Sequence, residues 1–218
     1  MLDQPRLNVE NLGLMAYGEC LAVQRDLHAR VVAGTAPPTV LFVEHPPVLT
    51  LGRHADPQYL RFGAEFFAER GIEIFPVERG GEVTAHERGQ QVMYPILRLA
   101  DFRLLPKRYV ELLEQVVIGT LKRFGIEATT DPGSPGVWVG GDKIGAVGVR
   151  VKDRATLHGV ALNVSNDLAL FDMIIPCGIQ GKGVTTMTHV LRRPVPLDDV
   201  RGALATEIVQ ALGNLRKT

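Results

Sequence analysis

Strand-like and helix-like segments alternate along all 218 residues, with no low-complexity linker and no internal repeat between them. Apolar residues spaced by three or four positions predict the helices, and short β-branched runs predict the strands. This alternation favours an α+β or mixed α/β fold, with mixed sheets flanked by helices. We expect a single domain over residues 1–218, in which residues from about 194 to 218 form a small C-terminal helical appendage.

The element boundaries follow from turn and cap signals. Strands are predicted at 7–12, 40–44, 48–51, 72–77, 91–99, 137–139, 143–151 and 156–164. Helices are predicted at 17–32, 65–70, 106–124 and from 198 or 199 to 212, where Gly213 should end the last one. Gly140, Gly141 and Asp142 predict a hairpin turn. The polar stretch before residue 91 shows no periodicity, so no further element is predicted there.

Composition argues against several classes of protein. The formal net charge is zero and no basic run occurs, so we expect no nucleic-acid partner. No apolar stretch is long enough to span a bilayer, and the N-terminus lacks the pattern of a signal peptide, so we expect a cytoplasmic protein. Two cysteines, without Cys-x-x-Cys or clustered His and Cys, indicate neither a disulfide framework nor a structural zinc.

The nucleotide-binding glycine motifs are also missing. The glycine-rich stretch 178–185 is not a P-loop, because Lys182 precedes Gly183 instead of Ser or Thr. No Gly-x-Gly-x-x-Gly follows a predicted strand. We therefore expect no cofactor and no metal.

Cys177 is the first candidate for chemistry. It lies between Pro176, which fixes the backbone, and Gly178, which carries no side chain. That context suits a thiol held at a defined angle and open to a large electrophile, so Cys177 is a candidate nucleophile for an acyl group. The alternative is a small buried hydrophobe, which is the common state of a free cysteine. Cys20 lies on the apolar face of a predicted helix and is interpreted as a core residue.

Lys143 is the candidate charge partner of the cysteine. Strict strand alternation places it on the apolar face with Gly145 and Val147, opposite Arg150 and Lys152. A lysine at the end of such a face can lie over a cavity, where a nearby thiolate favours its charged form. The alternative is a strand-end lysine whose amine reaches bulk solvent.

A third candidate is the segment from Arg79 to His86. Its adjacent glycines, Gly80 and Gly81, allow the backbone to approach a ligand closely. The alternative is an ordinary loop between two strands, with His86 on the surface.

Five ordered motifs together resemble the lipoyl(octanoyl) transferase family. They are Arg-Gly-Gly-x-Val-Thr-x-His at 79–86 followed by Gly-Gln-Gln-Val at 89–92, Pro-Gly-Val-x-Val-Gly at 135–140, Lys-Ile at 143–144, His-Gly-x-Ala-Leu-Asn at 158–163, and Ile-Pro-Cys-Gly at 175–178. The resemblance covers about residues 12–187 and implies a catalytic domain like those of biotin and lipoate protein ligases.

The resemblance implies an acyltransferase of lipoate biosynthesis and protein lipoylation. Octanoyl would pass from octanoyl-acyl carrier protein, through a thioester on Cys177, to a lysine ε-amino group. The acceptors would be lipoyl domains of 2-oxoacid dehydrogenases and the glycine cleavage H protein. Lys143 would lower the pKa of the thiol and act as acid and base. No ATP is required, because thioester exchange is nearly balanced in energy and amide formation is downhill.

The resemblance also assigns substrate-binding residues. They are Arg79, Gly80, Gly81, Glu82, Val83, Thr84, Ala85, His86, Ala146, Val147, Gly148, Gly159, Val160 and Ala161. The sequence departs from the family pattern at Ala85, Glu87, Arg88 and Ala146, where Tyr, Gly, Pro and Ser are usual. These departures concern the polar contacts of the pocket and its preference for acyl length.

Three other functions remain open from the residues. An ATP-dependent lipoate or biotin ligase of the same fold would use a lysine near the acyl carboxylate and would not need Cys177. A non-catalytic acyl-binding protein would keep only the pocket. The sequence at 141–144 also resembles the lysine turn of a lipoyl carrier domain, although such carriers are much smaller than this chain.

Overall fold

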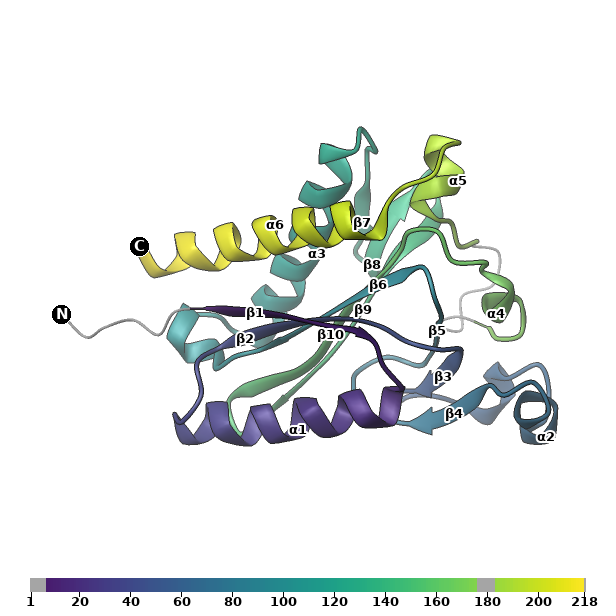
Figure 1. The fold of residues 1–218 in the computed structure, drawn as a ribbon, viewed down its shortest axis with the longest axis horizontal. Helices are drawn as coiled ribbons and strands as arrows, with labels where there is room; N and C mark the ends of the chain where they lie inside the picture. The colour runs from purple at the N-terminus through teal and green to yellow at the C-terminus, as the bar shows by residue number, and fades with distance from the viewer. Residues whose placement is uncertain (1–6, 176–182, 218) are drawn as a thin grey trace.

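The computed structural model describes residues 7–175 and 183–217, and its centre is a sheet of seven strands (Figure 1). The strands are β1 (Asn8–Leu14), β2 (Thr39–Glu44), β6 (Gln90–Ile96), β7 (Thr129–Asp131), β8 (Ser134–Val139), β9 (Asp142–Lys152) and β10 (Ala155–Asn163). Their order is β1-β2-β6-β10-β9-β8-β7. The sheet is mixed, because β1 and β2 run parallel while the other neighbours pair antiparallel.

A second, smaller sheet lies beside the first (Figure 1). Its strands are β3 (Val48–Leu51), β4 (Glu73–Pro76) and β5 (Val83–His86), in the order β4-β3-β5. The sequence predicted no strand at β5. This strand is only four residues long, so the alternation of buried Val83 and Ala85 with Thr84 is too short to give a clear periodicity. Its antiparallel partner β3 brings Val48 opposite His86 and Leu51 opposite Val83.

Helices cover both faces of the large sheet, as Figure 1 shows. They are α1 (Tyr17–Ala33), α2 (Ala64–Ala68), α3 (Pro106–Arg123), α4 (Ala169–Asp172), α5 (Met187–Leu191) and α6 (Leu197–Lys217), with 3-10 turns η1 (Pro57–Tyr59) and η2 (Leu99–Phe102). α1 packs on one face, and α3 and α6 pack on the other. The predicted class, mixed sheets flanked by helices, is confirmed.

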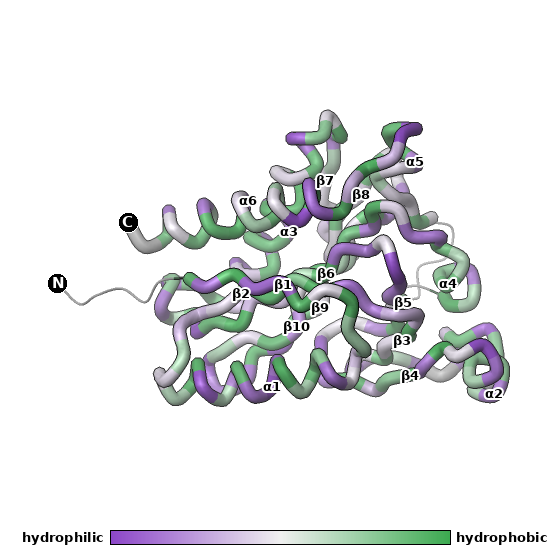
Figure 2. Tube along the Cα trace, in the orientation of Figure 1, coloured by the Kyte–Doolittle hydropathy of each residue, from purple (hydrophilic) through white to green (hydrophobic). Residues whose placement is uncertain are grey.

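The sequence explains the position of α1. Hydrophobic and hydrophilic residues alternate along it in Figure 2, as expected for a helix with one buried face. Its buried Cys20, Leu27 and Val31 contact residues of β2 and β6. Gly34 ends the helix in the left-handed conformation, with φ 73°, and its N–H donates to the Val31 carbonyl. Cys20 is 1% exposed, so it belongs to the core as predicted.

The C-terminal helix α6 packs against α3 within the same core. Val200, Leu204, Ile208 and Leu212 are each at most 1% exposed and share one apolar cluster with α3 and the sheet. The predicted helix end at Gly213 is wrong, because α6 continues to Lys217. An interior glycine costs a helix only about 1 kcal/mol, and the apolar stripe on either side outweighs that cost.

Most other boundaries follow the sequence. β3 has the predicted bounds, and the remaining predicted strand ends differ by no more than three residues. The hairpin between β8 and β9 is confirmed, with positive φ at both Gly140 and Gly141. Among the described residues, no helix is both long and apolar enough to cross a membrane.

Candidate active site

A cavity lies between the large sheet and the segment that contains β5. Its empty volume is about 530 Å³, which includes space open to solvent. It is lined by Tyr17, Arg79, Gly81, Glu82, Val83, Thr84, His86, Val92, Tyr94, Pro135, Lys143, Ala146, Val147, Gly148, His158, Gly159, Val160 and Ala161. The fold thus brings together the three segments that the sequence singled out with Lys143.

Two of the predicted binding residues do not line the cavity. Gly80 donates its N–H to the Val149 carbonyl at 2.9 Å, which ties the segment to β9. Ala85 is completely buried and packs with Leu49 and Phe67 in the apolar cluster of the small sheet. Its neighbours Thr84 and His86 both line the cavity.

Small residues on three adjacent strands make the floor of the cavity. Ala161 on β10 pairs with Ala146 on β9 and with Val92 on β6. Two residues further along β9, Gly148 pairs with Gly159 of β10. Short side chains at these positions leave space above the sheet, which larger residues would fill.

Arg79 lines the cavity, and its side chain packs closely against two glycines. A Cβ on Gly148 would lie 2.9 Å from Arg79 Cδ, and one on Gly52 would lie 2.8 Å from Arg79 Nη1. The Nη2 group donates to the carbonyl of Thr50 at 2.7 Å and to its Oγ1 at 2.8 Å. Gly81 has φ 83°, which an L side chain rarely adopts. The glycines therefore make room for a buried guanidinium.

Lys143 is buried at the edge of this cavity, with 7% of its surface exposed. Its Nζ donates to the Pro135 carbonyl at 3.1 Å and to Ser134 Oγ at 3.4 Å, and it lies 4.8 Å from the Trp138 ring centroid. A Cβ on Gly136 would lie 3.0 Å from Lys143 Cε. The ammonium is thus held by β8 and does not reach bulk solvent.

A bulge changes the face on which Lys143 lies. β9 pairs Gly145 with Val137 but Lys143 with the adjacent Trp138, so the register shifts by one residue between them. Strict alternation, which grouped Lys143 with Gly145, is therefore wrong at this point. Gly145 faces α3, whereas Lys143 lines the cavity with Ala146.

Cys177 lies outside the described residues. The described chain stops at Ile175, whose N–H donates to the Tyr59 carbonyl at 2.8 Å. It resumes at Gly183, whose carbonyl accepts a hydrogen bond of 2.9 Å from the N–H of Lys143. Gly183, six residues after Cys177, is therefore in direct contact with Lys143.

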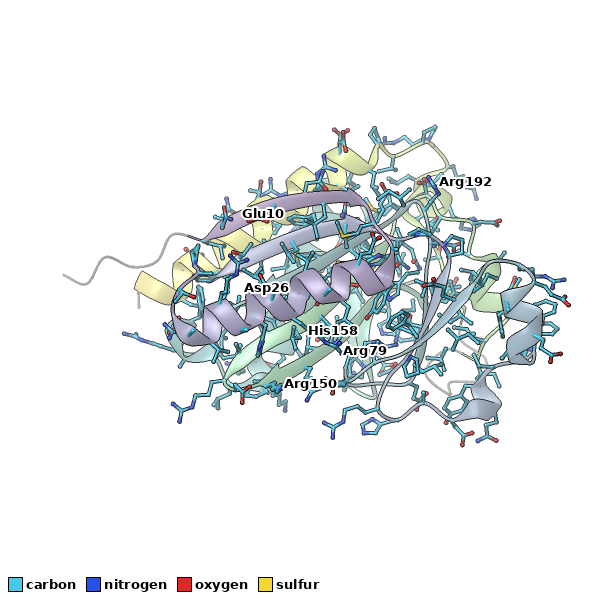
Figure 3. All side chains as sticks on the ribbon, turned by 60° about the horizontal axis from the view of Figure 1, so that its bottom comes forward. Glu10, Asp26, Arg79, Arg150, His158 and Arg192 are labelled. Atoms are coloured by element: carbon cyan, nitrogen blue, oxygen red, sulfur yellow. The ribbon has the colours of Figure 1, made fainter. Side chains whose placement is uncertain are left out.

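Polar aromatic side chains from α1, β5, β6 and β10 line another part of the cavity. Tyr17 OH lies 3.4 Å from His158 Nδ1, and Tyr94 OH donates to His45 Nε2 at 3.0 Å. The His45 Nδ1–H donates to a backbone carbonyl, which fixes its tautomer. The Tyr17 ring stacks on His86, with 5.9 Å between centroids. Figure 3, in which Arg79 and His158 are both labelled, shows them close together on the α1 side of the sheet.

Burial keeps these three histidines neutral. It lowers the pKa of His45 to about 4 and the pKa of both His86 and His158 to about 3. The nearby Arg79 lowers the pKa of His86 and His158 further. At neutral pH the cavity therefore presents uncharged imidazoles beside one guanidinium.

Five residues that line the cavity were not predicted as site residues: Tyr17, Val92, Tyr94, Pro135 and His158. Three of them, Val92, Pro135 and His158, lie inside the family motifs but received no role. Tyr17 was read only as part of the apolar face of its helix. A hydrogen-bonding aromatic residue within an otherwise apolar element was the available signal, because buried Tyr and His require polar partners.

Glu87, one of the departures from the family pattern, holds a neighbouring loop. It is 8% exposed, and its Oε1 accepts hydrogen bonds from Asn166 Nδ2 at 3.2 Å and from the Leu168 N–H at 3.1 Å. Burial raises the pKa of this carboxyl group. The substitution therefore replaces a usual glycine with a side chain that ties the β5–β6 turn to the loop after β10.

Within residues 7–175 and 183–217, no group of three or more His, Cys, Asp or Glu could hold a metal ion.

Comparisons with known proteins give three kinds of similarity. The family model of the lipoyl protein ligase A/B catalytic domain matches residues 16–209. Octanoyltransferase of Alkaliphilus metalliredigens is 44% identical over 190 residues, which cover 87% of each chain. Octanoyltransferase of Geobacter metallireducens is 41% identical over 197 residues, which cover 90% of this chain and 89% of the relative.

Solved structures show the same fold at low identity. A lipoate-protein ligase A bound with ATP superposes with a TM-score of 0.76 at 17% identity, covering 96% of this chain and 86% of that one. Biotin protein ligase from Aquifex aeolicus in complex with biotin and ATP gives 0.59 at 13% identity, covering 97% and 72%.

Proposed function

This chain belongs to the family of the lipoyl protein ligase A/B catalytic domain, and from that premise we propose that it transfers octanoyl through a thioester on Cys177. The chain is an enzyme, an octanoyltransferase of protein lipoylation, since relatives of that name share 41% and 44% identity over almost nine tenths of it. The donor is octanoyl-acyl carrier protein and the acceptors are lipoyl domains.

In the first half-reaction the Cys177 thiolate attacks the thioester carbonyl of the donor. A new thioester forms on the enzyme and the C–S bond to the carrier breaks. The carrier leaves as a thiolate that takes its proton from the Lys143 ammonium, so Lys143 becomes neutral. A positive charge near a thiol favours the thiolate. The ammonium of Lys143 is suited to this role, because a carbonyl, a hydroxyl and the face of Trp138 hold it at the cavity edge.

In the second half-reaction the lysine amine of the acceptor attacks the acyl-enzyme. An amide bond forms, the C–S bond breaks, and Cys177 leaves as a thiolate. The amine must lose a proton, and a neutral Lys143 accepts it as general base. The resulting ammonium stands beside the regenerated thiolate, so the pair returns to its starting charge state.

The cavity suits the acyl chain of this reaction. Its floor of Ala146, Ala161, Val92 and two glycines is apolar and has space above it. The octanoyl chain has seven CH₂ or CH₃ groups beyond its carbonyl. At about 0.8 kcal/mol for each buried CH₂, the slot can supply roughly 5 kcal/mol of binding energy.

The observation that carries the proposal is the burial of Lys143 where the cavity meets the chain that follows Cys177. It is tested by mixing the enzyme with octanoyl-carrier protein in the absence of ATP and measuring intact mass. We expect a gain of one octanoyl group, labile to hydroxylamine, in the parent and in Cys20→Ala. The Cys177→Ala variant should gain none.

The same experiment separates the rival functions. An adduct that persists in Cys177→Ala contradicts the assignment of the nucleophile. A requirement for ATP, with release of pyrophosphate, identifies a ligase of the same fold. If neither the parent nor any variant consumes the donor, the protein only binds acyl chains.

A further inference from the structure

Two consecutive residues of β8, Pro135 and Gly136, are left out of the pairing of the sheet. Among the described residues, β7 pairs with Ser134 and with Val137, and β9 pairs with Val137 and the residues after it. Neither register includes Pro135 or Gly136. The peptide unit that joins these two residues is instead bound by side chains, one at each end.

Glu114 on α3 binds the N–H end of this peptide unit. Its Oε1 accepts a hydrogen bond from the Gly136 N–H at 2.8 Å, and the residue is only 7% exposed. A buried carboxylate requires donors of this kind, because its removal from water is unfavourable. Gly136 has φ 137°, which an L side chain rarely adopts, so the glycine permits this orientation of the peptide. Glu114 does not line the cavity.

Lys143 binds the carbonyl end of the same peptide unit. Its Nζ donates to the Pro135 carbonyl at 3.1 Å. In a trans peptide the N–H and the C=O point in opposite directions, so the carboxylate and the ammonium lie on opposite sides of one planar group. These two hydrogen bonds and the width of the peptide place Glu114 Oε1 at most about 8 Å from Lys143 Nζ. Hydrogen bonds linked in this way strengthen one another.

We infer that Glu114 is a positioning residue for Lys143. Its carboxylate fixes the plane of the 135–136 peptide, and the fixed carbonyl then holds the ammonium at the edge of the cavity. This role deepens the proposed function, on which it rests for its effect on catalysis. Without the carboxylate the peptide can rotate, its carbonyl turns away from Nζ, and the amine becomes accessible to solvent.

Chemical labelling measures the position of Lys143 without any catalysis. The amine reacts with N-hydroxysuccinimidyl acetate, and peptide mass spectrometry gives the rate of acetylation at residue 143. In the parent this rate should be low, because the lysine is 7% exposed and hydrogen-bonded. Glu114→Ala should raise it roughly tenfold, the factor expected when one hydrogen bond to a charged group is lost. Glu114→Gln keeps an oxygen that accepts the Gly136 N–H, and it should react like the parent.

Thr120→Ala is the matched control for a weakened α3. Thr120 is completely buried on the same helix, and its Oγ1 donates to the Val116 carbonyl at 2.8 Å. This variant should lose stability without any change in the acetylation of Lys143. If thermal melting shows that Glu114→Ala is not folded, Glu114→Asp takes its place. Aspartate keeps the charge but is one CH₂ too short for the hydrogen bond, so it should give the same rise.

Transfer kinetics provide the second measurement. Glu114→Ala should lower kcat for octanoyl transfer roughly tenfold with KM nearly unchanged, and glutamine should restore it. Unchanged acetylation of Lys143 in the folded alanine or aspartate variant would overturn the inference. An equal rise in Glu114→Gln or Thr120→Ala would also overturn it.

The labelling result does not depend on the proposed chemistry. Faster acetylation of Lys143 in Glu114→Ala, with transfer unchanged, would support the positioning of the lysine and contradict its proposed role in catalysis. Slower transfer with unchanged acetylation would show that Glu114 does not act through Lys143.

Discussion

Lowering the pH from 7.5 to 5.5 should destabilise the folded protein by about 4 kcal/mol through three buried histidines in and beside the cavity. Burial lowers the folded-state pKa of His45 to about 4 and that of His86 and His158 to about 3. In the unfolded chain each is near 6.5. Below pH 6.5 the unfolded state therefore binds more protons than the folded state, so stability falls as the pH falls.

The magnitude follows from that difference. The stabilisation is fully present above pH 6.5 and is lost as the pH falls toward the folded-state pKa values. At pH 5.5, one unit below the unfolded pKa, each histidine contributes a loss of about 1.4 kcal/mol, or about 4 kcal/mol for three. Glu87 acts in the opposite direction, because burial raises its pKa and the folded state therefore binds its proton more tightly than the unfolded state does.

Urea unfolding followed by far-ultraviolet circular dichroism is the assay. With a slope of about 2 kcal/mol/M, a loss of about 4 kcal/mol lowers the midpoint by about 2 M at constant slope. The control is His45→Asn, whose Nδ2 can still donate to the carbonyl that His45 Nδ1 contacts. It should show about two thirds of the pH dependence of the parent. A parent whose midpoint moves by less than about 0.5 M, or a control that matches the parent, would refute the reasoning.

Three further substitutions test the site and its scaffold. Lys143→Met should shift the alkylation of Cys177 by iodoacetamide to higher pH, and an unchanged profile would show that the lysine does not set the ionisation of the thiol. Gly148→Ala places a Cβ 2.9 Å from Arg79 Cδ. The overpacking should cost about 1–3 kcal/mol and lower kcat/KM for octanoyl donors roughly tenfold. Normal kinetics would show that Arg79 moves freely. Gly202 lies at an exposed helical position, and an added Cβ would have no heavy atom within 4 Å. Gly202→Ala should therefore raise the free energy of unfolding by about 0.5–1 kcal/mol, measured by thermal melting. A lower melting temperature would contradict the packing described for α6.

Sequence patterns identified the segments that meet at the cavity better than they predicted the direction of the side chains. Glycine pairs and small residues marked the segments that meet at the cavity, because close backbone approach requires them. The bulge at Lys143 was invisible, since it arises from pairing with β8 and leaves no mark in the alternation of β9 itself.

The aromatic lining of the cavity was equally hard to predict. Tyr17 has the spacing of a core residue, and only its contact with His158, 141 positions away, reveals its polar role. The end of α6 shows that tertiary packing can also override a local sequence signal. Gly213 is a helix terminator by local preference, but the packing of α6 on α3 decides the outcome.

The position of Trp138 gives the enzyme a built-in optical signal. It is the only tryptophan of the chain, it is 5% exposed, and its indole N–H donates to the Ser134 carbonyl. The Lys143 ammonium stands 4.8 Å from the ring. A cation at that distance alters the emission of an indole, so each change in the charge or position of the lysine changes the intrinsic fluorescence. Stopped-flow fluorimetry can thus test for the two proposed half-reactions in the unlabelled protein.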